Sequence, residues 1–374
     1  MSGARFDLVI LGLSLSSSWG NGHATTYRSL LRGLARRGLR VLFLERDVPW
    51  YAGNRDLPDP DFCDLALYAD LQELERFRAA IRTAGAVMVG SYVPDGIAAI
   101  DRVLSWRPRG VSFYDIDTPV TLAALERNDC AYLAARQIPG FETYFSFTGG
   151  PTLGRLEQHY GARRAAPLYC SVDVERYRPS GQPPRWDLGY LGTYSEDRQP
   201  ALERLLIEPA RRLPDRRFVV AGPQYPDGID WPANVERIDH LPPAEHAAFY
   251  GRQRFTLNVT RAAMVAAGWS PSVRLFEAAA CGTPIVSDRW PGLEELLPHG
   301  EAAVIADGTD AVVEVLASMP EDRRRALAAE ARRRVASRHS SDARAEELAA
   351  ALGLDGDEPV EGEPVEGEPV EGEP

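Results

Sequence analysis

A histidine that closes a glycine-bearing loop is the first feature of the chain that could do chemistry. Gly20-Asn21-Gly22-His23 ends a loop of small residues that begins at Ser14 and leads into a helical stripe. Glycines at such a position let backbone N–H groups approach an anion, and the helix N-terminus adds partial positive charge. An imidazole can act as a base near neutral pH. His23 is therefore a candidate base, and a tight turn with a capping histidine is the alternative.

Two acids, Asp115 and Asp117, lie one residue apart at the end of a predicted strand. Such a pair could hold a divalent metal, but alternate residues share a face only where the strand continues. Asp117 is followed by Thr118-Pro119, which is typical of an N-cap and an early helical proline. Three interpretations of Asp117 stay open: a helix cap, a substrate or base residue, and a metal ligand.

Residues 270–284, SPSVRLFEAAACGTP, hold the most informative acid. Pro271 near the start predicts a helix over 271–281, and Gly282 is suited to a left-handed C-cap. Because the helix otherwise carries small residues, we expect Glu277 to be exposed and to accept hydrogen bonds from adjacent hydroxyls, such as those of a ribose. Free backbone N–H groups around Ser272 could receive a phosphate.

The elements that position these residues alternate between strands and helices, which predicts an α/β fold with parallel sheets. Continuous apolar runs such as FDLVILGL at 6–13 are typical of strands buried on both faces. Open parallel sheets bind ligands at the carboxyl ends of their strands, so two such halves would enclose a cleft. We expect strands at 6–13, 40–44, 86–89, 110–114, 143–147, 166–170, 187–191, 217–221, 255–259 and 284–287, and helices that include 95–105, 118–127, 152–160, 200–212, 271–281, 292–297 and 321–352.

A length of 374 residues favours two domains. A polar segment rich in Gly and Pro follows residue 172 and predicts the linker, and the closing Glu-Pro-Val-Glu-Gly repeat predicts disorder. The predicted organisation is an N-terminal Rossmann-like domain at 1–172, a linker at 173–185, a second Rossmann-like domain at 186–338, a C-terminal helix at 339–354 and an acidic tail at 355–374.

Composition excludes several classes of protein. The chain has no lysine, which removes Schiff-base and P-loop chemistry. The net charge of −12 and pI near 5.1 give no basic surface for a nucleic acid. The four cysteines show no C-x-x-C spacing, no signal peptide is recognisable, and no apolar run is long enough to span a membrane, so we expect a soluble cytoplasmic protein.

The chain resembles the GT-B glycosyltransferases, and more narrowly the CgeB/YkvP-like (spore maturation protein) type. The broad likeness lies in RLFEAAACGTP at 274–284 with the linker VDVERYRP at 172–179, and the narrower one in SSWGNGHATTY at 17–27, YDIDTP at 114–119 and LGYLGTY at 188–194. The resemblance implies two Rossmann-like domains and a nucleotide-sugar donor held mostly by the C-terminal one. The donor-binding residues it implies are Glu277 at the ribose, Arg198 (or Arg261 and Arg274) at the diphosphate, and Gly22, Gly192, Tyr194, Gly222, Ser270 and Ser272; the acceptor-side residues are Trp19, Asn21 and Asp115.

The resemblance implies transfer of a hexose or similar sugar to a glycan, lipid or small-molecule acceptor. It suggests a cell-surface or spore glycan as the acceptor, and peripheral contact with a membrane stays open. If the reaction inverts, His23 is the first choice of base and Asp117 the second. Trp269 stands where many retaining relatives carry a second glutamate, so stereochemistry stays open. We expect no cofactor and no essential metal, because the D-x-D metal motif belongs to another fold. A sugar-nucleotide epimerase and a non-catalytic nucleotide-sugar binding protein are the alternatives; a dehydrogenase lacks its G-x-G-x-x-G fingerprint.

Overall fold

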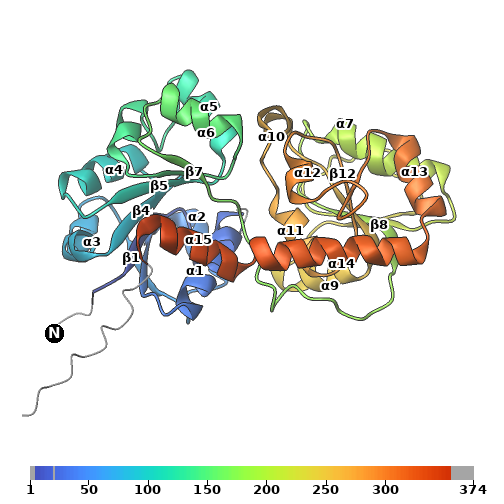
Figure 1. Ribbon diagram of the computed structural model, residues 1–374, viewed down its shortest axis with the longest axis horizontal. Coiled ribbons are helices and arrows are strands. Elements are labelled where there is room, and N and C mark those ends of the chain that lie inside the picture. Colours follow the sequence, from blue (N-terminus) through green and yellow to red (C-terminus); the bar gives the residue numbers. More distant parts are fainter. Residues whose placement is uncertain (1–4, 20–21, 355–374) are drawn as a thin grey trace, which may run out of the picture.

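Two α/β domains, each built on an all-parallel sheet, make up the part of the chain that the computed structural model describes, residues 5–19 and 22–354 (Figure 1). The predicted fold class is thereby confirmed. Asn21 and the acidic tail at 355–374, two subjects of the sequence predictions, lie outside the described residues.

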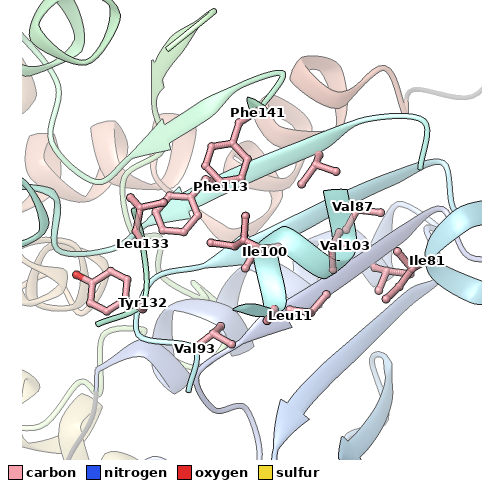
Figure 2. Close-up of a cluster of buried hydrophobic side chains, with 14 of the residues drawn as sticks. Leu11, Ile81, Val87, Val93, Ile100, Val103, Phe113, Tyr132, Leu133 and Phe141 are labelled. Carbon is pink, nitrogen blue, oxygen red and sulfur yellow. The ribbon is translucent and has the colours of Figure 1, made fainter. Parts of the chain in front are cut away.

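The N-terminal sheet has seven parallel strands in the order β3-β2-β1-β4-β5-β6-β7. Its central strands are continuous apolar runs because both faces are covered by helices. Successive residues alternate between the faces: Leu11 and Val87 lie in one buried cluster, and Ile10 and Met88 lie in the other. Figure 2 shows the first cluster, in which Ile100 and Val103 pack over the sheet. The strands are β1 (Leu8–Gly12), β2 (Val41–Arg46), β3 (Asp64–Tyr68), β4 (Ala86–Gly90), β5 (Val111–Asp115), β6 (Tyr144–Ser146) and β7 (Ala165–Pro167), and the helices are α1 (His23–Arg36), α2 (Pro49–Ala52), η1 (Glu73–Phe77), α3 (Arg78–Thr83), α4 (Gly96–Ser105), α5 (Thr118–Glu126), η2 (Ala135–Gly140) and α6 (Pro151–Gln158).

The C-terminal sheet has six parallel strands in the order β10-β9-β8-β11-β12-β13. Its strands are β8 (Trp186–Leu191), β9 (Phe218–Ala221), β10 (Val235–Ile238), β11 (Gln253–Asn258), β12 (Ile285–Ser287) and β13 (Val304–Ile305). Its helices are α7 (Gln199–Leu202), η3 (Glu203–Ile207), α8 (Glu208–Arg212), η4 (Pro243–Glu245), α9 (His246–Gly251), α10 (Ala262–Ala267), α11 (Val273–Ala280), α12 (Leu293–Leu296), α13 (Thr309–Ser318) and α14 (Glu321–Arg338).

Two predicted elements differ in extent. The helix expected over 200–212 is divided into α7, the π-helical segment η3, and α8. Pro209 has no N–H and cannot donate to the carbonyl four residues earlier, which accounts for the irregular turn before it. The strand expected at 166–170 ends at Pro167, after which the chain leaves the sheet edge.

The chain crosses between the domains twice, and the two crossings are hydrogen-bonded to each other. The N–H of Val172 donates to the carbonyl of His339 at 3.0 Å, and the N–H of Ser341 donates to that of Val172 at 2.9 Å. The last helix, α15 (Ser341–Leu352), then packs on α1 of the N-terminal domain (Figure 1). Gly33 allows this approach, because a Cβ atom there would lie 2.2 Å from the carbonyl oxygen of Ser341.

Candidate functional site

The carboxyl ends of the strands in the two sheets carry most of the residues singled out by the sequence. β1, β4 and β5 lead to His23, Tyr92 and Asp117 in one domain. β8 and β11 lead to Gly192 and to the segment that begins at Thr260 in the other. In a parallel sheet these ends share one edge, which is where open α/β sheets bind ligands.

His23 and Asp117 lie together. His23 is the first residue of α1, is 7% exposed, and its Nε2 lies 3.9 Å from Oδ2 of Asp117. Asp117 occupies the N-cap position of α5, but its side chain makes no capping hydrogen bond. The carboxylate is therefore not used by the helix, which leaves it available to the histidine.

Asp115 is fully buried, which corrects the expectation that it contacts the acceptor directly. Its side chain is fully buried and accepts hydrogen bonds from Tyr144 Oη at 2.6 Å, Thr121 Oγ1 at 2.7 Å and the backbone N–H of Asp117 at 3.3 Å. Burial raises the pKa of this carboxyl to about 6, against the lowering effect of the hydrogen bonds. Asp115 is thus an interior group of the N-terminal domain.

Three arginines form a positive cluster in the C-terminal domain. Arg274, on α11, donates from Nε to the carbonyl of Leu191 at 2.6 Å and from Nη1 to Oδ1 of Asn258 at 3.1 Å. Arg198 donates to the carbonyl of Thr193 at 2.6 Å, and its Nε is buried without a partner. Burial, and then the charges of Arg274 and Arg261, lower the pKa of Arg198. A bound anion would reduce the repulsion between the arginines and would accept a hydrogen bond from the unpaired Nε of Arg198.

Two glycines hold the loop after β8 against the turn after β9. Gly222 has φ +139°, and a Cβ atom there would lie 2.1 Å from the carbonyl oxygen of Gly192. Tyr225 donates to the same oxygen at 3.1 Å, and the N–H of Tyr194 donates to the carbonyl of Pro223 at 3.0 Å. A side chain at Gly192 would reach Arg274 Nη2 at 2.9 Å, so the backbone there lies directly beside the arginine cluster.

The serines before α11 are less available than predicted. Ser270 is buried, donates to the carbonyl of Gly268 at 3.0 Å, and shares a 2.6 Å hydrogen bond with Thr148 of the other domain. Its assignment to the donor site is therefore not supported: it joins the domains. Ser272 stands at the N-cap position, but its hydroxyl donates to Asn258 at 2.8 Å instead of capping the helix. The helix begins at Val273, two residues later than expected, and ends as predicted before Gly282 at φ +70°.

Glu277 is buried, which corrects the expectation of an exposed carboxylate. It is 3% exposed, accepts a hydrogen bond from Tyr250 Oη at 3.1 Å, and lies 3.9 Å from Nδ1 of His246. The hydroxyl of Tyr177, from the linker, is also close enough for the charge of Glu277 to act on it. Burial, and then the charge of Glu277, raises the pKa of both tyrosine hydroxyls, which therefore remain donors.

An interdomain cavity of about 1160 Å³ nevertheless reaches Glu277. Its wall includes Trp19 and Arg28 from the N-terminal domain, Tyr177 from the linker, and His240 from the C-terminal domain. Trp19 is 57% exposed. Gly22 is exposed as well, with open space where a Cβ would point.

Two functional candidates were missed by the sequence analysis. Tyr92 follows β4 in a left-handed conformation at φ +62°, and its ring lies edge-on to His23 with centroids 5.3 Å apart. Asn258 ends β11 and orders both Ser272 and Arg274. Each follows a strand at the ligand-binding edge, and that position is the signal that could have found them. Among residues 5–19 and 22–354, no group of His, Cys, Asp and Glu is placed to hold a metal ion, and no helix is long and apolar enough to cross a membrane.

Two facing Rossmann-like domains with this arrangement are the GT-B architecture of glycosyltransferases. Residues 198–350 match a family model described as "Glycosyl transferase-like". The chain is 29% identical over 160 residues to the D-inositol 3-phosphate glycosyltransferase of Mycobacterium sp. strain JLS, an alignment that covers 38% of this chain and 36% of that relative. It therefore spans about a third of the length of this curated relative.

Solved structures extend the likeness in fold over nearly the whole chain. Sucrose-phosphate synthase from Thermosynechococcus elongatus superposes with a TM-score of 0.65 at 13% identity, covering 93% of this chain and 98% of that one. Anabaena HepE in complex with UDP-glucose gives a TM-score of 0.63 at 12% identity, covering 92% and 99%. At these identities the likeness establishes the fold.

Proposed function

We propose that the protein is a glycosyltransferase that takes a sugar from a nucleoside diphosphate and passes it to an acceptor hydroxyl. The observation that carries the proposal is the cluster of Arg198, Arg261 and Arg274 in the same domain as Glu277, which lies three residues after Arg274 on α11 and lines the interdomain cavity. Negative charge grows on a departing diphosphate, and fixed positive groups aimed at it lower the barrier. The arginine forks supply that charge in a chain without lysine.

In this proposal Glu277 recognises the ribose from the wall of the cavity. A carboxylate can accept a hydrogen bond from each of two neighbouring hydroxyls. Tyr250 already donates to it and so fixes its position before the nucleotide arrives. The complexes of Anabaena HepE with UDP and glucose and with UDP-glucose support a nucleotide-sugar donor.

The acceptor oxygen attacks the anomeric carbon, the bond from that carbon to the diphosphate breaks, and the hydroxyl proton must leave. His23, with Asp117 beside it, is placed to take that proton. Trp269 stands where many retaining relatives carry a second glutamate, so this position supplies no carboxylate. With a candidate base at His23, we infer an inverting reaction, and the proposal includes no essential metal or cofactor.

The finer assignments rest on resemblance. The motifs at 17–27 and 114–119 support a CgeB/YkvP-like enzyme, and the acceptor class follows as a glycan, lipid or small molecule, in the cytoplasm. The inositol phosphate named for the mycobacterial relatives makes a small phosphorylated polyol one acceptor to include in a screen.

The test is a panel of nucleoside diphosphate sugars, with binding read by calorimetry and products by mass spectrometry. Transfer to an added acceptor, or slow donor hydrolysis, supports the proposal. Binding with the donor left intact would favour the non-catalytic binding protein, and an isomerised sugar would favour the epimerase. Absence of nucleotide binding would contradict all three.

A further inference from the structure

The buried carboxylate of Asp115 is connected to both members of the His23–Asp117 pair. The first connection is direct: Oδ1 of Asp115 accepts the backbone N–H of Asp117 at 3.3 Å. It fixes the start of α5, where the Asp117 side chain leaves the helix without capping it. The position of the Asp117 carboxylate therefore depends on a group that no ligand can reach.

The second connection runs through hydroxyl groups. Thr121 Oγ1 donates to the same Oδ1 of Asp115 at 2.7 Å, and the hydroxyl of Tyr132 lies 2.7 Å from Thr121 Oγ1. Because the Thr121 proton is given to the carboxylate, Tyr132 is the donor of that second bond. The ring of Tyr132 in turn packs against the ring of Tyr92, with centroids 4.5 Å apart.

Tyr92 completes the route to the histidine. Its ring meets the His23 imidazole edge-on, with an interplanar angle of 88°. A bulky side chain at φ +62° is strained and persists only where its surroundings hold it, and such strain gathers at functional sites. The charges of Asp117 and of Arg261 in the opposite domain both act on the Tyr92 hydroxyl, so this ring lies where the halves of the site meet.

We propose that Asp115 is the positioning residue of the acceptor side, which holds Asp117 directly and His23 through Thr121, Tyr132 and Tyr92. The inference deepens the proposed function and rests on it for the role of the pair. It also gives a role to both acids of the Y-D-I-D-T-P segment: the first is buried and holds the second, whose carboxylate lies beside His23. An apolar interior would not fix two separate elements around one point, whereas a side-chain oxygen can accept several donors.

Asp115 offers its own matched control, because its other oxygen is bonded elsewhere. Tyr144 donates to Oδ2 at 2.6 Å and has no part in the route to Tyr92. Thr121→Val and Tyr132→Phe break the route at nearly constant shape, whereas Tyr144→Phe removes a hydroxyl from the same carboxylate and leaves the route intact. Asp115→Asn keeps an oxygen facing Thr121 and Asp117, so it is the conservative variant, with Asp115→Ala as its partner.

The primary measurement is the NMR resonance of the His23 imidazole, assigned among the six histidines with His23→Gln. We expect Thr121→Val and Tyr132→Phe to shift it and to lower the kcat for donor turnover by about tenfold or more, with the KM for the donor unchanged. Tyr144→Phe is expected to leave the resonance in place and kcat within about twofold. Asp115→Asn should restore what Asp115→Ala loses.

The idea is overturned if Tyr144→Phe shifts the resonance as much as Thr121→Val does, or if neither shifts it. If the three variants lose the same amount of melting temperature, a loss of stability cannot explain a difference between their His23 resonances. Should the wild-type protein turn over no nucleotide sugar, the proposed function fails, while the imidazole resonance still decides whether Asp115 positions His23.

Discussion

The indole of Trp269 fills the space that a side chain at Gly150 would need. A Cβ atom at Gly150 would lie 2.5 Å from Cδ2 of Trp269, and both residues have positive φ, +58° and +43°. The backbone N–H of Gly149 donates to the Trp269 carbonyl at 2.9 Å. Since the two residues belong to different domains, this contact holds the domains together at the cleft, in addition to the hydrogen-bonded crossings at Val172 and Ser341.

Gly150→Ala should therefore open the cleft. Gly150 has φ +58° and ψ −142°, close to a backbone region that essentially only glycine adopts, so a side chain there costs about 1–3 kcal/mol. The clash with the indole adds to this cost. Small-angle scattering should show a larger radius of gyration. Gly38→Ala is the control, because Gly38 has φ +78° but no atom within 4 Å of its Cβ position. Equal behaviour of the two variants in scattering would show that the indole contact does not hold the domains.

Arg198→Gln should weaken binding of a nucleoside diphosphate much more than binding of the nucleoside. Charge-assisted hydrogen bonds are worth about 1.5–3 kcal/mol, so calorimetry should show a loss of about 10- to 100-fold for the diphosphate. Arg212→Gln is the control, since Arg212 is exposed and pairs with Asp310 away from the cluster. A similar loss for the nucleoside would remove Arg198 from the diphosphate site.

Glu277→Gln should weaken both the nucleoside and the diphosphate, because the ribose is common to them. Loss of a charged acceptor predicts about a 10-fold or larger rise in Kd. Glu236→Gln, at a half-exposed carboxylate bonded to Arg185 and Trp186, should change neither. Unchanged nucleoside affinity in Glu277→Gln would mean that the buried carboxylate serves only Tyr177 and Tyr250.

The sequence was sufficient for the central strands and insufficient for the edges. β1 is buried along its whole length, and its apolar run indicates that directly. The edge strands β3 and β10 were not predicted: DLALY is a short apolar run of which only Tyr68 is buried, and VERI carries two charged residues. The two-residue strand β13 leaves no pattern to recognise.

The residues of the candidate site were likewise predictable only in part. His23 and Asp117 were found because each ends a strand–loop unit, and the structure brings them within 3.9 Å. The burial of Glu277 could not be predicted, since Tyr177 and Tyr250 come from the linker and from another helix. Tyr92 is marked only by a backbone angle, which spacing along the chain does not express.

Asp115 should also leave a signature in the pH dependence of stability. Its pKa is raised from 3.8 to about 6 in the folded protein, chiefly by burial. Between those values the folded state keeps a proton that the unfolded state has lost, so the free energy of unfolding falls as pH rises from about 4 to 6, by up to about 1.4 kcal/mol per pH unit. The stabilisation is complete below that range and absent above it.

Urea unfolding of the wild type and Asp115→Asn from pH 4 to 7 should show that only the wild type carries this decline. Asp101→Asn is the control, because the hydrogen bond with Arg136 holds the pKa of Asp101 below its ordinary value. Replacing Asp101 should therefore leave the decline of the unfolding free energy with rising pH in place. Parallel curves for the wild type and Asp115→Asn would mean that Asp115 keeps an ordinary pKa in the folded protein.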